Sequence, residues 1–145
     1  MDSSNLSKKA CPVGRGIACV GDAWTLLILR DASRGLGRFD QFRTSLNIAP
    51  SMLTRRLAYL TEEGLLEKRR YSEKPPRDEY VLTEAGRDFV PVLVALGEWG
   101  RRHRGGGKVN RFVDVETSKE LRPVVIDAVT KAEIGSRPFT MVGPK

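Results

Sequence analysis

The sequence predicts a mainly α-helical fold with one small β-hairpin, followed by a short C-terminal extension with strand character. Two observations support this prediction. Apolar residues recur at helical spacing over most of the chain before Gly64, and the spacing changes to that of two short strands only after it. The chain has 145 residues, of which 40% are hydrophobic and 30% charged. This length favours one domain with an appendage over two full domains.

The first predicted helix covers residues 15–33, after a flexible arm over residues 1–10. Its apolar side chains occupy more than one face, because Ala18, Leu26 and Leu29 lie outside the main stripe. The residues leave two interpretations equally open, a central core helix and a subunit interface. The main stripe consists of Ile17, Val20, Trp24, Leu27 and Ile28.

A short second helix is predicted over residues 41–46. Asp40 is a good N-cap for this helix, Phe42 supplies its buried side chain, and Asn47 suits the left-handed position that closes it. Residues 38–39, just before the cap, are expected to form a very short strand.

The third helix begins at Pro50, whose missing N–H costs nothing in a first turn, and ends before Gly64. Leu53, Leu57 and Leu60 recur at the spacing of one helix face and must face the core. The opposite face is small, rich in hydrogen-bond donors and nearly free of carboxylates, as expected of a surface that lies in the major groove of DNA. This face consists of Ser51, Thr54, Arg55 and Ala58.

The residues of the exposed face suggest separate roles. Arg55 has the geometry to bind guanine with two hydrogen bonds, whereas Ser51 and Thr54 can contact either a base or a phosphate. Arg56 projects nearer the flank of the helix and is a better candidate for a phosphate contact. The alternative is an ordinary amphipathic helix with a solvated polar face, and the helix in isolation favours that alternative.

A basic hairpin is predicted directly after this helix. Strands are expected over residues 65–71 and 79–82, joined by a polar loop over residues 72–78 that two prolines stiffen. A stiff basic loop reaches a phosphate or the minor groove with little ordering cost. The cations are Lys68, Arg69, Arg70, Lys74 and Arg77, which with Glu73 as the single acid give residues 68–77 a charge of +4.

A further helix is predicted after the hairpin. Thr83 is expected to cap it, and Pro91 to kink or restart it. Trp24 and Trp99 are interpreted as anchors of the core or of a dimer interface rather than as walls of a ligand site. The apolar stripe of this helix consists of Phe89, Val92, Leu93, Leu96 and Trp99.

The C-terminal region begins with a glycine-rich hinge at residues 105–107. Residues 111–115, 123–128 and 138–142 have strand character, and no internal repeat is evident. The extension is too short to bury a core of its own, so we expect it to pack on the main domain or on a partner subunit.

The composition excludes several classes of function. The chain carries 25 Lys and Arg against 18 Asp and Glu, a net charge of +7, and a protein this basic usually binds nucleic acid. No apolar run is long enough to span a bilayer, and the polar N-terminus resembles no signal peptide, so we expect a cytoplasmic protein without a membrane partner. Two cysteines and one histidine are too few for a disulfide scaffold, a zinc site or an obvious triad. We therefore expect no metal, no cofactor and no enzymatic activity.

The order helix, short helix, helix and basic hairpin is that of a winged helix-turn-helix domain. We place this domain over residues 11–104, with the hinge and extension over residues 105–145. The basic hairpin follows the third helix directly, and this combination favours DNA binding. An RNA-binding or non-specific nucleoid-type protein is the alternative, although RNA modules usually display stacking aromatic residues and no such cluster is evident.

Five short motifs, CPV, DAWTLLILR, RF, LTRRL and PPR, begin at Cys11, Asp22, Arg38, Leu53 and Pro75. With these motifs the chain resembles the HxlR family of bacterial transcriptional regulators, which belongs with the MarR-like winged-helix proteins. The resemblance covers residues 11–104. One residue departs from the family pattern, because Ala49 stands where Ser or Thr often precedes the proline of the recognition helix; the lost cap costs about 1 kcal/mol.

The resemblance implies a bacterial homodimer, joined through the first helix and the helix after Thr83, that binds an inverted repeat in promoter DNA, more often as a repressor. It makes residues 50–63 the recognition helix and residues 68–77 the wing. The implied dimer contacts are Ile17, Val20, Trp24, Val92, Leu96 and Trp99. The candidate DNA contacts are Ser51, Thr54, Arg55, Arg56, Lys68, Arg70, Lys74 and Arg77.

The resemblance also suggests a redox function. Some family members sense oxidants or electrophiles through a cysteine at the position of Cys11, often by an intersubunit disulfide. Lys8, Lys9 and Arg15 are close in sequence and would favour a thiolate. The alternative is that Cys11 is a packed and inert residue, as we expect for Cys19.

Overall fold

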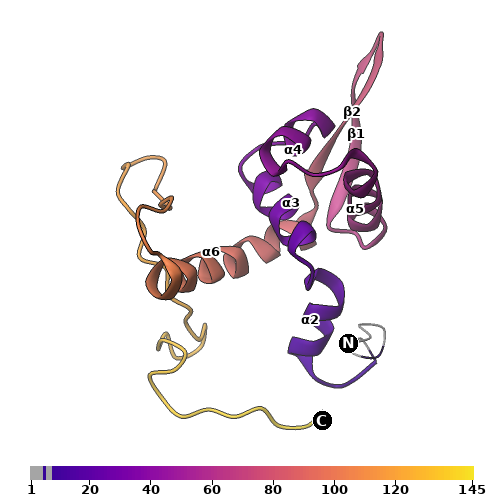
Figure 1. Cartoon of the computed structure of the whole chain (residues 1–145). Coiled ribbons are helices and arrows are strands. Elements are labelled where there is room, and N and C mark those ends of the chain that lie inside the picture. The colour runs from indigo at the N-terminus through magenta and orange to yellow at the C-terminus, as the bar shows by residue number, and fades with distance from the viewer. Residues whose placement is uncertain (1–4, 6–7) are drawn as a thin grey trace. The chain divides into compact units, whose positions relative to one another are not determined.

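Figure 1 shows a computed structural model of the chain, which describes residue 5 and residues 8–145. The chain divides into two compact units, one up to Val90 and one from Pro91 onward. Most of the arm expected over residues 1–10 lies outside the described residues. The described helices and strands follow the order α2, α3, α4, α5, β1, β2 and α6.

The single helix expected over residues 15–33 is wrong, because the structure has two helices there. α2 covers Pro12–Val20 and α3 covers Ala23–Ser33, and their axes differ by 81°. Asp22 starts the second helix, since its carboxylate accepts hydrogen bonds from the Thr25 amide at 2.9 Å and the Thr25 hydroxyl at 2.5 Å. Capping at Asp22 outweighs the apolar stripe that appears continuous in the sequence.

Within the described residues, no single helix is long and apolar enough to cross a membrane. α2 and α3 pass the length and composition test only as a pair, and the sharp bend separates them.

α4 (Phe39–Leu46) begins two residues earlier than expected and replaces the strand expected at residues 38–39. The Gln41 side chain accepts hydrogen bonds from the amides of Gly37 and Arg38, both at 3.0 Å, and so takes the capping role expected of Asp40. The left-handed conformation of Asn47 is confirmed, with φ of 49°.

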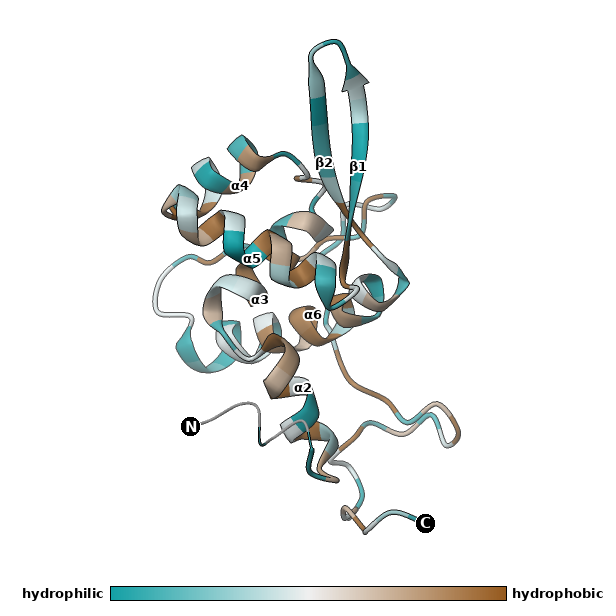
Figure 2. Cartoon of the chain, turned by 90° about the vertical axis from the view of Figure 1, so that its right-hand side faces the viewer, coloured by the Kyte–Doolittle hydropathy of each residue, from teal (hydrophilic) through white to brown (hydrophobic). Residues whose placement is uncertain are grey.

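α5 (Pro50–Glu62) confirms the predicted third helix. Gly64 follows it with φ of +75°, a conformation that favours glycine. The buried face of α5 packs with α3, α4 and β1, and Figure 2 shows the apolar sides of these helices facing one another. The core of this unit comprises Val20, Ile28, Leu29, Phe42, Ile48, Leu53, Leu57, Leu60, Leu65 and Leu66.

The hairpin is longer than the sequence predicts. β1 (Leu66–Glu73) and β2 (Pro76–Leu82) pair in antiparallel register, with Leu66 opposite Leu82. The expected loop over residues 72–78 is therefore wrong, because both strands extend into it. A proline at the first residue of an edge strand leaves the ladder intact, so the prolines do not end the pairing. The hairpin projects well beyond the helices that support it (Figure 1).

α6 (Glu84–Arg104) runs through Pro91 without restarting. The expected cap is confirmed, since the Thr83 hydroxyl accepts a hydrogen bond from the Gly86 amide at 3.1 Å and donates one to the Gly64 carbonyl at 2.5 Å. Gly86 lies against the Leu65 carbonyl, where a side chain would clash. These contacts fix the start of α6 to the base of the hairpin.

The extension, residues 108–145, is described throughout and contains two turns in place of the expected strands. Isolated bridges join Val113 to Glu120 and Ile126 to Glu133. The expectation that the chain has no internal repeat is also wrong, because the two bridged turns are successive copies of one motif. The copies are offset by thirteen residues and share too few identities to stand out in the sequence.

Candidate nucleic-acid interface

The two faces of α5 are as the sequence predicts. Leu53, Leu57 and Leu60 are buried, whereas the opposite face is open to solvent along its length. This exposed face is made of Ser51, Thr54, Arg55 and Ala58. All four residues are exposed, so a nucleic-acid groove can approach this face.

The polar groups on this face remain available for a ligand. The Arg55 guanidinium makes one weak contact, 3.7 Å from Nη2 to the Met52 sulfur, and joins no ion pair within residues 8–145. The Thr54 hydroxyl donates to the Pro50 carbonyl at 3.0 Å and keeps its capacity to accept. Ala49, the N-cap, offers no side-chain oxygen to the first turn, so the amides there are open to an external acceptor.

Arg56 lies differently from the other candidates on α5. Its Nη1 atom is 3.5 Å from the Asp22 carboxylate, and its side chain is only 32% exposed. Asp22 also caps α3, so this ion pair ties α5 to the start of α3. The structure therefore places Arg56 against its own protein rather than on the open face. Sequence reasoning could not find this contact, because 34 residues separate the partners in the chain.

Tyr59 is a second link that the sequence did not reveal. Its hydroxyl donates a 2.7 Å hydrogen bond to the carbonyl of Cys19 in α2. Burial is the largest cause that raises the pKa of Tyr59, so the hydroxyl remains a donor. Through this bond α5 also contacts the helix that carries both cysteines.

On the wing, Asp78 binds two of the candidate cations. Its carboxylate lies 2.9 Å from Arg70 Nε and 3.7 Å from Lys68 Nζ. Arg70 also contacts Glu73 at 3.4 Å. The hydrogen bond from Arg70 is the largest cause that lowers the pKa of Asp78, so Asp78 stays ionised at neutral pH. The +4 charge of residues 68–77 is thus partly neutralised by an acid just outside that range.

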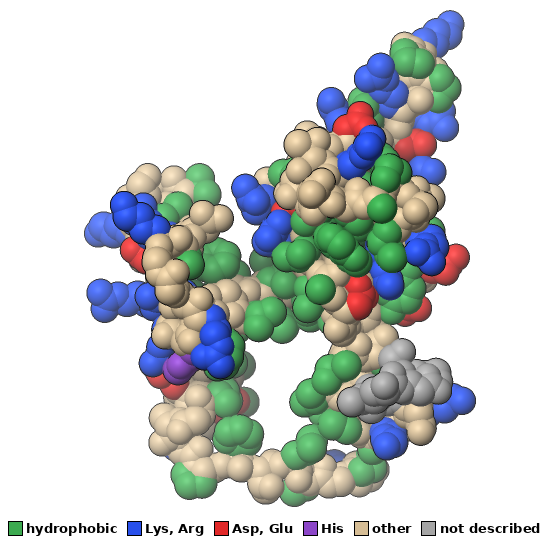
Figure 3. Space-filling model, viewed as in Figure 1, with side chains coloured by type: hydrophobic (Ala, Val, Ile, Leu, Met, Phe, Trp, Pro, Cys, Tyr) green, Lys and Arg blue, Asp and Glu red, His purple; other side chains and the backbone are tan. Residues whose placement is uncertain are grey.

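Lys74 and Arg77 are the open cations of the wing. Both are exposed and neither joins an ion pair in the described part of the chain. Basic side chains extend along the hairpin in Figure 3. Arg38 adds a cation at the hairpin, because its guanidinium lies 4.6 Å from the centre of the Tyr71 ring. The RF motif was the only sequence signal for this contact.

The two cysteines occupy opposite ends of α2. Cys11 is its N-cap, and its sulfur accepts a 3.4 Å hydrogen bond from the Gly14 amide. Burial, followed by the charge of Glu63, raises the pKa of Cys19. Eight helical residues span about 12 Å, whereas a disulfide requires Cα atoms within about 7 Å. The two thiols of one chain therefore cannot pair with each other while α2 is intact.

The candidate dimer residues differ in exposure. Val20 is buried in the core of its own unit, and Trp24 is half-buried. The other four, Ile17, Val92, Leu96 and Trp99, expose about half of their surface. Exposed apolar residues at this spacing on α6 form a surface available to a partner.

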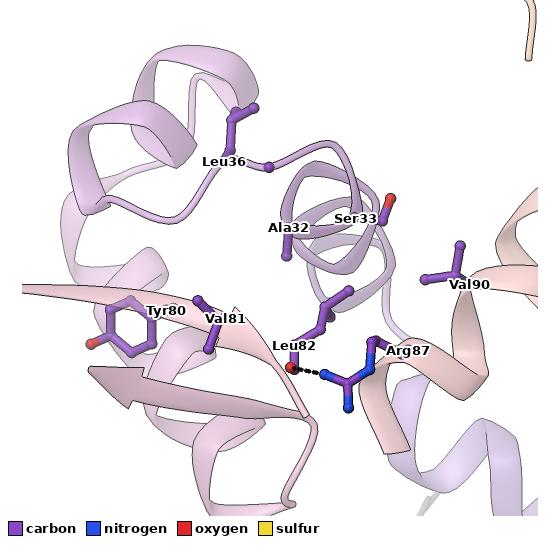
Figure 4. A pocket seen from close by; sticks show the side chains of 9 residues that line it. Ala32, Ser33, Leu36, Tyr80, Val81, Leu82, Arg87 and Val90 are labelled. Carbon is purple, nitrogen blue, oxygen red and sulfur yellow. Dashed lines mark hydrogen bonds between the residues drawn. The ribbon is translucent and has the colours of Figure 1, made fainter. Parts of the chain in front are cut away.

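An open hollow of about 370 Å³ lies beside α3, β2 and the first turns of α6 (Figure 4). Its walls are mainly apolar and include Leu36, Tyr80 and Val90. The one cation, Arg87, donates to the Leu82 carbonyl at 2.9 Å. The hollow therefore lacks the convergent free polar groups of a specific ligand site, and we assign it no ligand.

Three helices that support a projecting basic hairpin, with a polar helix face exposed beside it, define a winged helix-turn-helix protein of the DNA-binding class. Comparison with known proteins then identifies the family. The HxlR-like helix-turn-helix family model matches residues 19–107, and the chain belongs to this family of transcriptional regulators.

Relatives support this assignment. The chain is 49% identical over 88 residues to an uncharacterized HTH-type transcriptional regulator of Mycobacterium tuberculosis, an alignment that covers 61% of this chain and 56% of the relative. The chain thus spans little more than half the length of that relative. It is 32% identical to YdeP, an uncharacterized HTH-type transcriptional regulator of Bacillus subtilis, over 72% of this chain and 82% of that one.

Solved structures extend the comparison. The crystal structure of the transcription factor candidate PA1607 superposes with a TM-score of 0.86 at 30% identity and covers 95% of this chain and 98% of its own. That match includes most of the C-terminal extension. The redox regulator HypR in its reduced form superposes with a TM-score of 0.61 at 33% identity, over 65% of this chain and 94% of its own.

Proposed function

We propose that this regulator is a homodimer that reads a specific inverted repeat in the bacterial cytoplasm and represses transcription from the promoter that contains it. α5 enters the major groove, and the wing, residues 68–77, contacts the backbone or the minor groove. One observation carries the proposal: the exposed face of α5 presents Arg55, which joins no ion pair within the described residues, beside a projecting basic hairpin.

The contacts divide the candidate residues into three groups. Arg55, Ser51 and Thr54 face outward from α5 and are assigned to bases and nearby phosphates. Lys74 and Arg77 have no acidic partner in the described residues and are assigned to the backbone. The remaining three candidates are bound to acids of their own chain, Arg56 to Asp22 and both Lys68 and Arg70 to Asp78.

These ion pairs give the remaining candidates supporting roles in the proposal. Arg56 orients α5, and Asp78 sets how many wing cations are free for phosphate. A phosphate that displaces Asp78 from Arg70 exchanges one ion pair for another, so the net gain in binding free energy is smaller than for Arg77.

The homodimer is supported by unburied apolar surface. Val92, Leu96 and Trp99 lie half-exposed on α6, where a second copy would cover them. A two-fold symmetric dimer presents its two recognition helices to related half-sites, and an inverted repeat is the DNA symmetry that matches it.

Redox control through Cys11 is the second part of the proposal. HypR, a redox regulator, is similar in structure, and Cys11 is the N-cap of α2, with its sulfur 3.4 Å from the Gly14 amide. Since α2 geometry prevents a bond to Cys19 of the same chain, the oxidised form is assigned an intersubunit disulfide or a mixed disulfide. Cys19→Ser should keep the diamide response of DNA binding and Cys11→Ser should lose it. Equal responses of the two variants would exclude Cys11 as the sensor.

The decisive experiment selects random duplex DNA with the purified, reduced protein at physiological salt and sequences the retained fraction. We expect an enriched inverted repeat. The matched variant Arg55→Ala should lose preference at one position of each half-site and keep the others. Retained DNA without an enriched sequence would instead support a nucleoid-type or RNA-directed protein and remove the assignment of Arg55.

A further inference from the structure

The extension contains a duplicated turn. Residues 112–121 and 125–134 align without a gap, and an Asp, a Thr and a Glu are identical between the two copies. We call these segments the first and the second turn unit. Their identical residues are Asp114 and Asp127, Thr117 and Thr130, and Glu120 and Glu133.

The two turn units share their hydrogen bonds as well as their sequence. In each unit the Asp carboxylate accepts hydrogen bonds from the amides two and three residues further along the chain. The Thr hydroxyl accepts one from the amide two residues further on, at 3.3 Å in the first unit and 3.2 Å in the second. The residues after these threonines, Ser118 and Lys131, are left-handed with φ of 57° and 61°. The extension therefore repeats one local structure.

The duplication preserves large apolar residues at the leg positions of the turn, but not at its tip, where Val115 corresponds to Ala128. Leg positions pair Phe112 with Val125, Val113 with Ile126, and Leu121 with Ile134. At the tip, by contrast, Glu116 corresponds to Val129. A solvated turn needs no apolar legs, so their retention in both copies indicates a packing role.

The first turn unit shows what the legs pack against. The Phe112 ring lies on Gly97 of α6, so closely that a Cβ on Gly97 would come within 2.7 Å of it. An ion pair joins the two ends of the unit, with Arg111 Nη1 3.6 Å from the Glu120 carboxylate. The first unit thus docks on α6 through its leg residue Phe112.

The second turn unit has equivalent leg residues, and they are more exposed than those of the first unit, where Phe112, Val113 and Leu121 are 40%, 45% and 43% exposed. Val125 and Ile134 are 56% and 51% exposed. Thirteen large apolar side chains of the extension are exposed in total. Four of them, Val125, Ile126, Val129 and Ile134, belong to the second unit. This unit therefore supplies only part of the roughly 800 Å² that each partner contributes to a stable protein interface, and the exposed face of α6 adds to it.

The charge of the extension favours a protein partner over DNA. It carries seven Lys and Arg against five Asp and Glu, so most of the net +7 lies elsewhere in the chain. A nearly neutral, apolar segment has little attraction for phosphate.

We propose that the second turn unit packs on α6 of a second copy of this chain, and covers Val92, Leu96 and Trp99 there as the first unit covers Gly97 in its own chain. This inference rests on the proposed homodimer and deepens it. The first turn unit of each chain would then pack on its own α6, and the second turn unit on α6 of the partner. The exposed apolar surfaces of the second unit and of α6 would be buried together.

The test compares two double variants of the full chain, both of which add two aspartates. Val125→Asp with Ile134→Asp alters the legs of the second unit. Val115→Asp with Val129→Asp alters the two turn tips, where the native residues are 94% and 88% exposed. Sedimentation equilibrium gives the dimer dissociation constant, and hydroxyl-radical footprinting with mass spectrometry gives the oxidation rate of Trp99 at each dilution.

We expect the leg variant to raise the dissociation constant at least about tenfold and to speed oxidation of Trp99, whereas the tip variant should match the parent in both. If the leg variant matches the parent, the proposal is overturned and the homodimer stands. If Trp99 is protected equally in monomer and dimer but exposed in the leg variant, the second unit covers its own α6 and the proposal is again overturned. A parent chain that stays monomeric at all concentrations contradicts the homodimer itself.

Discussion

Replacing Asp78 with asparagine should strengthen DNA binding at low salt and make it more sensitive to salt. Asp78 lies opposite Arg70 in the hairpin register and holds both Arg70 and Lys68 by its carboxylate. Asparagine keeps the size of the side chain and removes its charge. The two cations are then free to neutralise phosphates.

The expected magnitude follows from counting released cations. Each added phosphate contact changes the slope of log affinity against log salt by about 0.9. Between 50 and 200 mM salt, one added contact therefore increases the loss of affinity by about 3.5-fold, and two added contacts by about 12-fold. Because the pKa of Asp78 is lowered by Arg70, the carboxylate is ionised throughout the neutral range, and the effect should be the same at pH 6 and pH 8.

Fluorescence anisotropy with a labelled duplex, repeated across the salt series, measures the affinity and its dependence on salt. Glu116→Gln is the matched control, because it changes the net charge equally but frees no wing cation: Glu116 joins no ion pair among the residues that the structure describes. The control should leave the slope nearly unchanged. A slope for Asp78→Asn that equals the control would refute the inference that Asp78 restrains the wing.

Three further predictions concern the same unit. Arg55→Ala should lower the binding free energy for the selected DNA site by about 1 to 3 kcal/mol and change that for random DNA little. Arg77→Ala should weaken binding to the selected site and to random DNA equally, and should lower the slope of log affinity against log salt by about one. Identical behaviour of the two variants would contradict the division of roles. Leu57→Ala should lower the free energy of unfolding in urea by about 2 to 5 kcal/mol, because the side chain is buried in the core, and a loss below about 1 kcal/mol would contradict that placement. Burial raises the pKa of Cys19, so its thiolate fraction at neutral pH is below that of a free thiol, and its alkylation by iodoacetamide should still be rising with pH where that of N-acetylcysteine has levelled off.

Much of the recognition unit could be predicted because its signals are local. The leucines of α5, the left-handed glycine after it and the cap at Thr83 each depend on residues within one or two turns. The break between α2 and α3 was also encoded locally, by Asp22, but the apolar stripe concealed it. Prolines in the wing suggested a loop, although an edge strand accommodates them.

Contacts between residues far apart in the chain could not be predicted from the sequence. The position of Arg56 depends on Asp22, and the number of free wing cations depends on which acid lies across the hairpin from Arg70. The duplicated turn is not evident in the sequence, because only three residues are identical between its copies. The matching hydrogen bonds of the two copies show that they are equivalent.

The hydrogen bond from Tyr59 to the Cys19 carbonyl joins the segment that carries both thiols to the helix that presents Arg55. A partly buried hydrogen bond of this kind contributes about 1 kcal/mol, and regulatory coupling between sites typically amounts to 1 to 3 kcal/mol. In the redox control proposed above, this bond would connect a chemical change on α2 to α5 without any thiol approaching the nucleic acid. A small rotation of α2 that breaks this bond would remove one of the contacts that hold α5 in place. Oxidation would then change DNA affinity through the orientation of α5 rather than through charge.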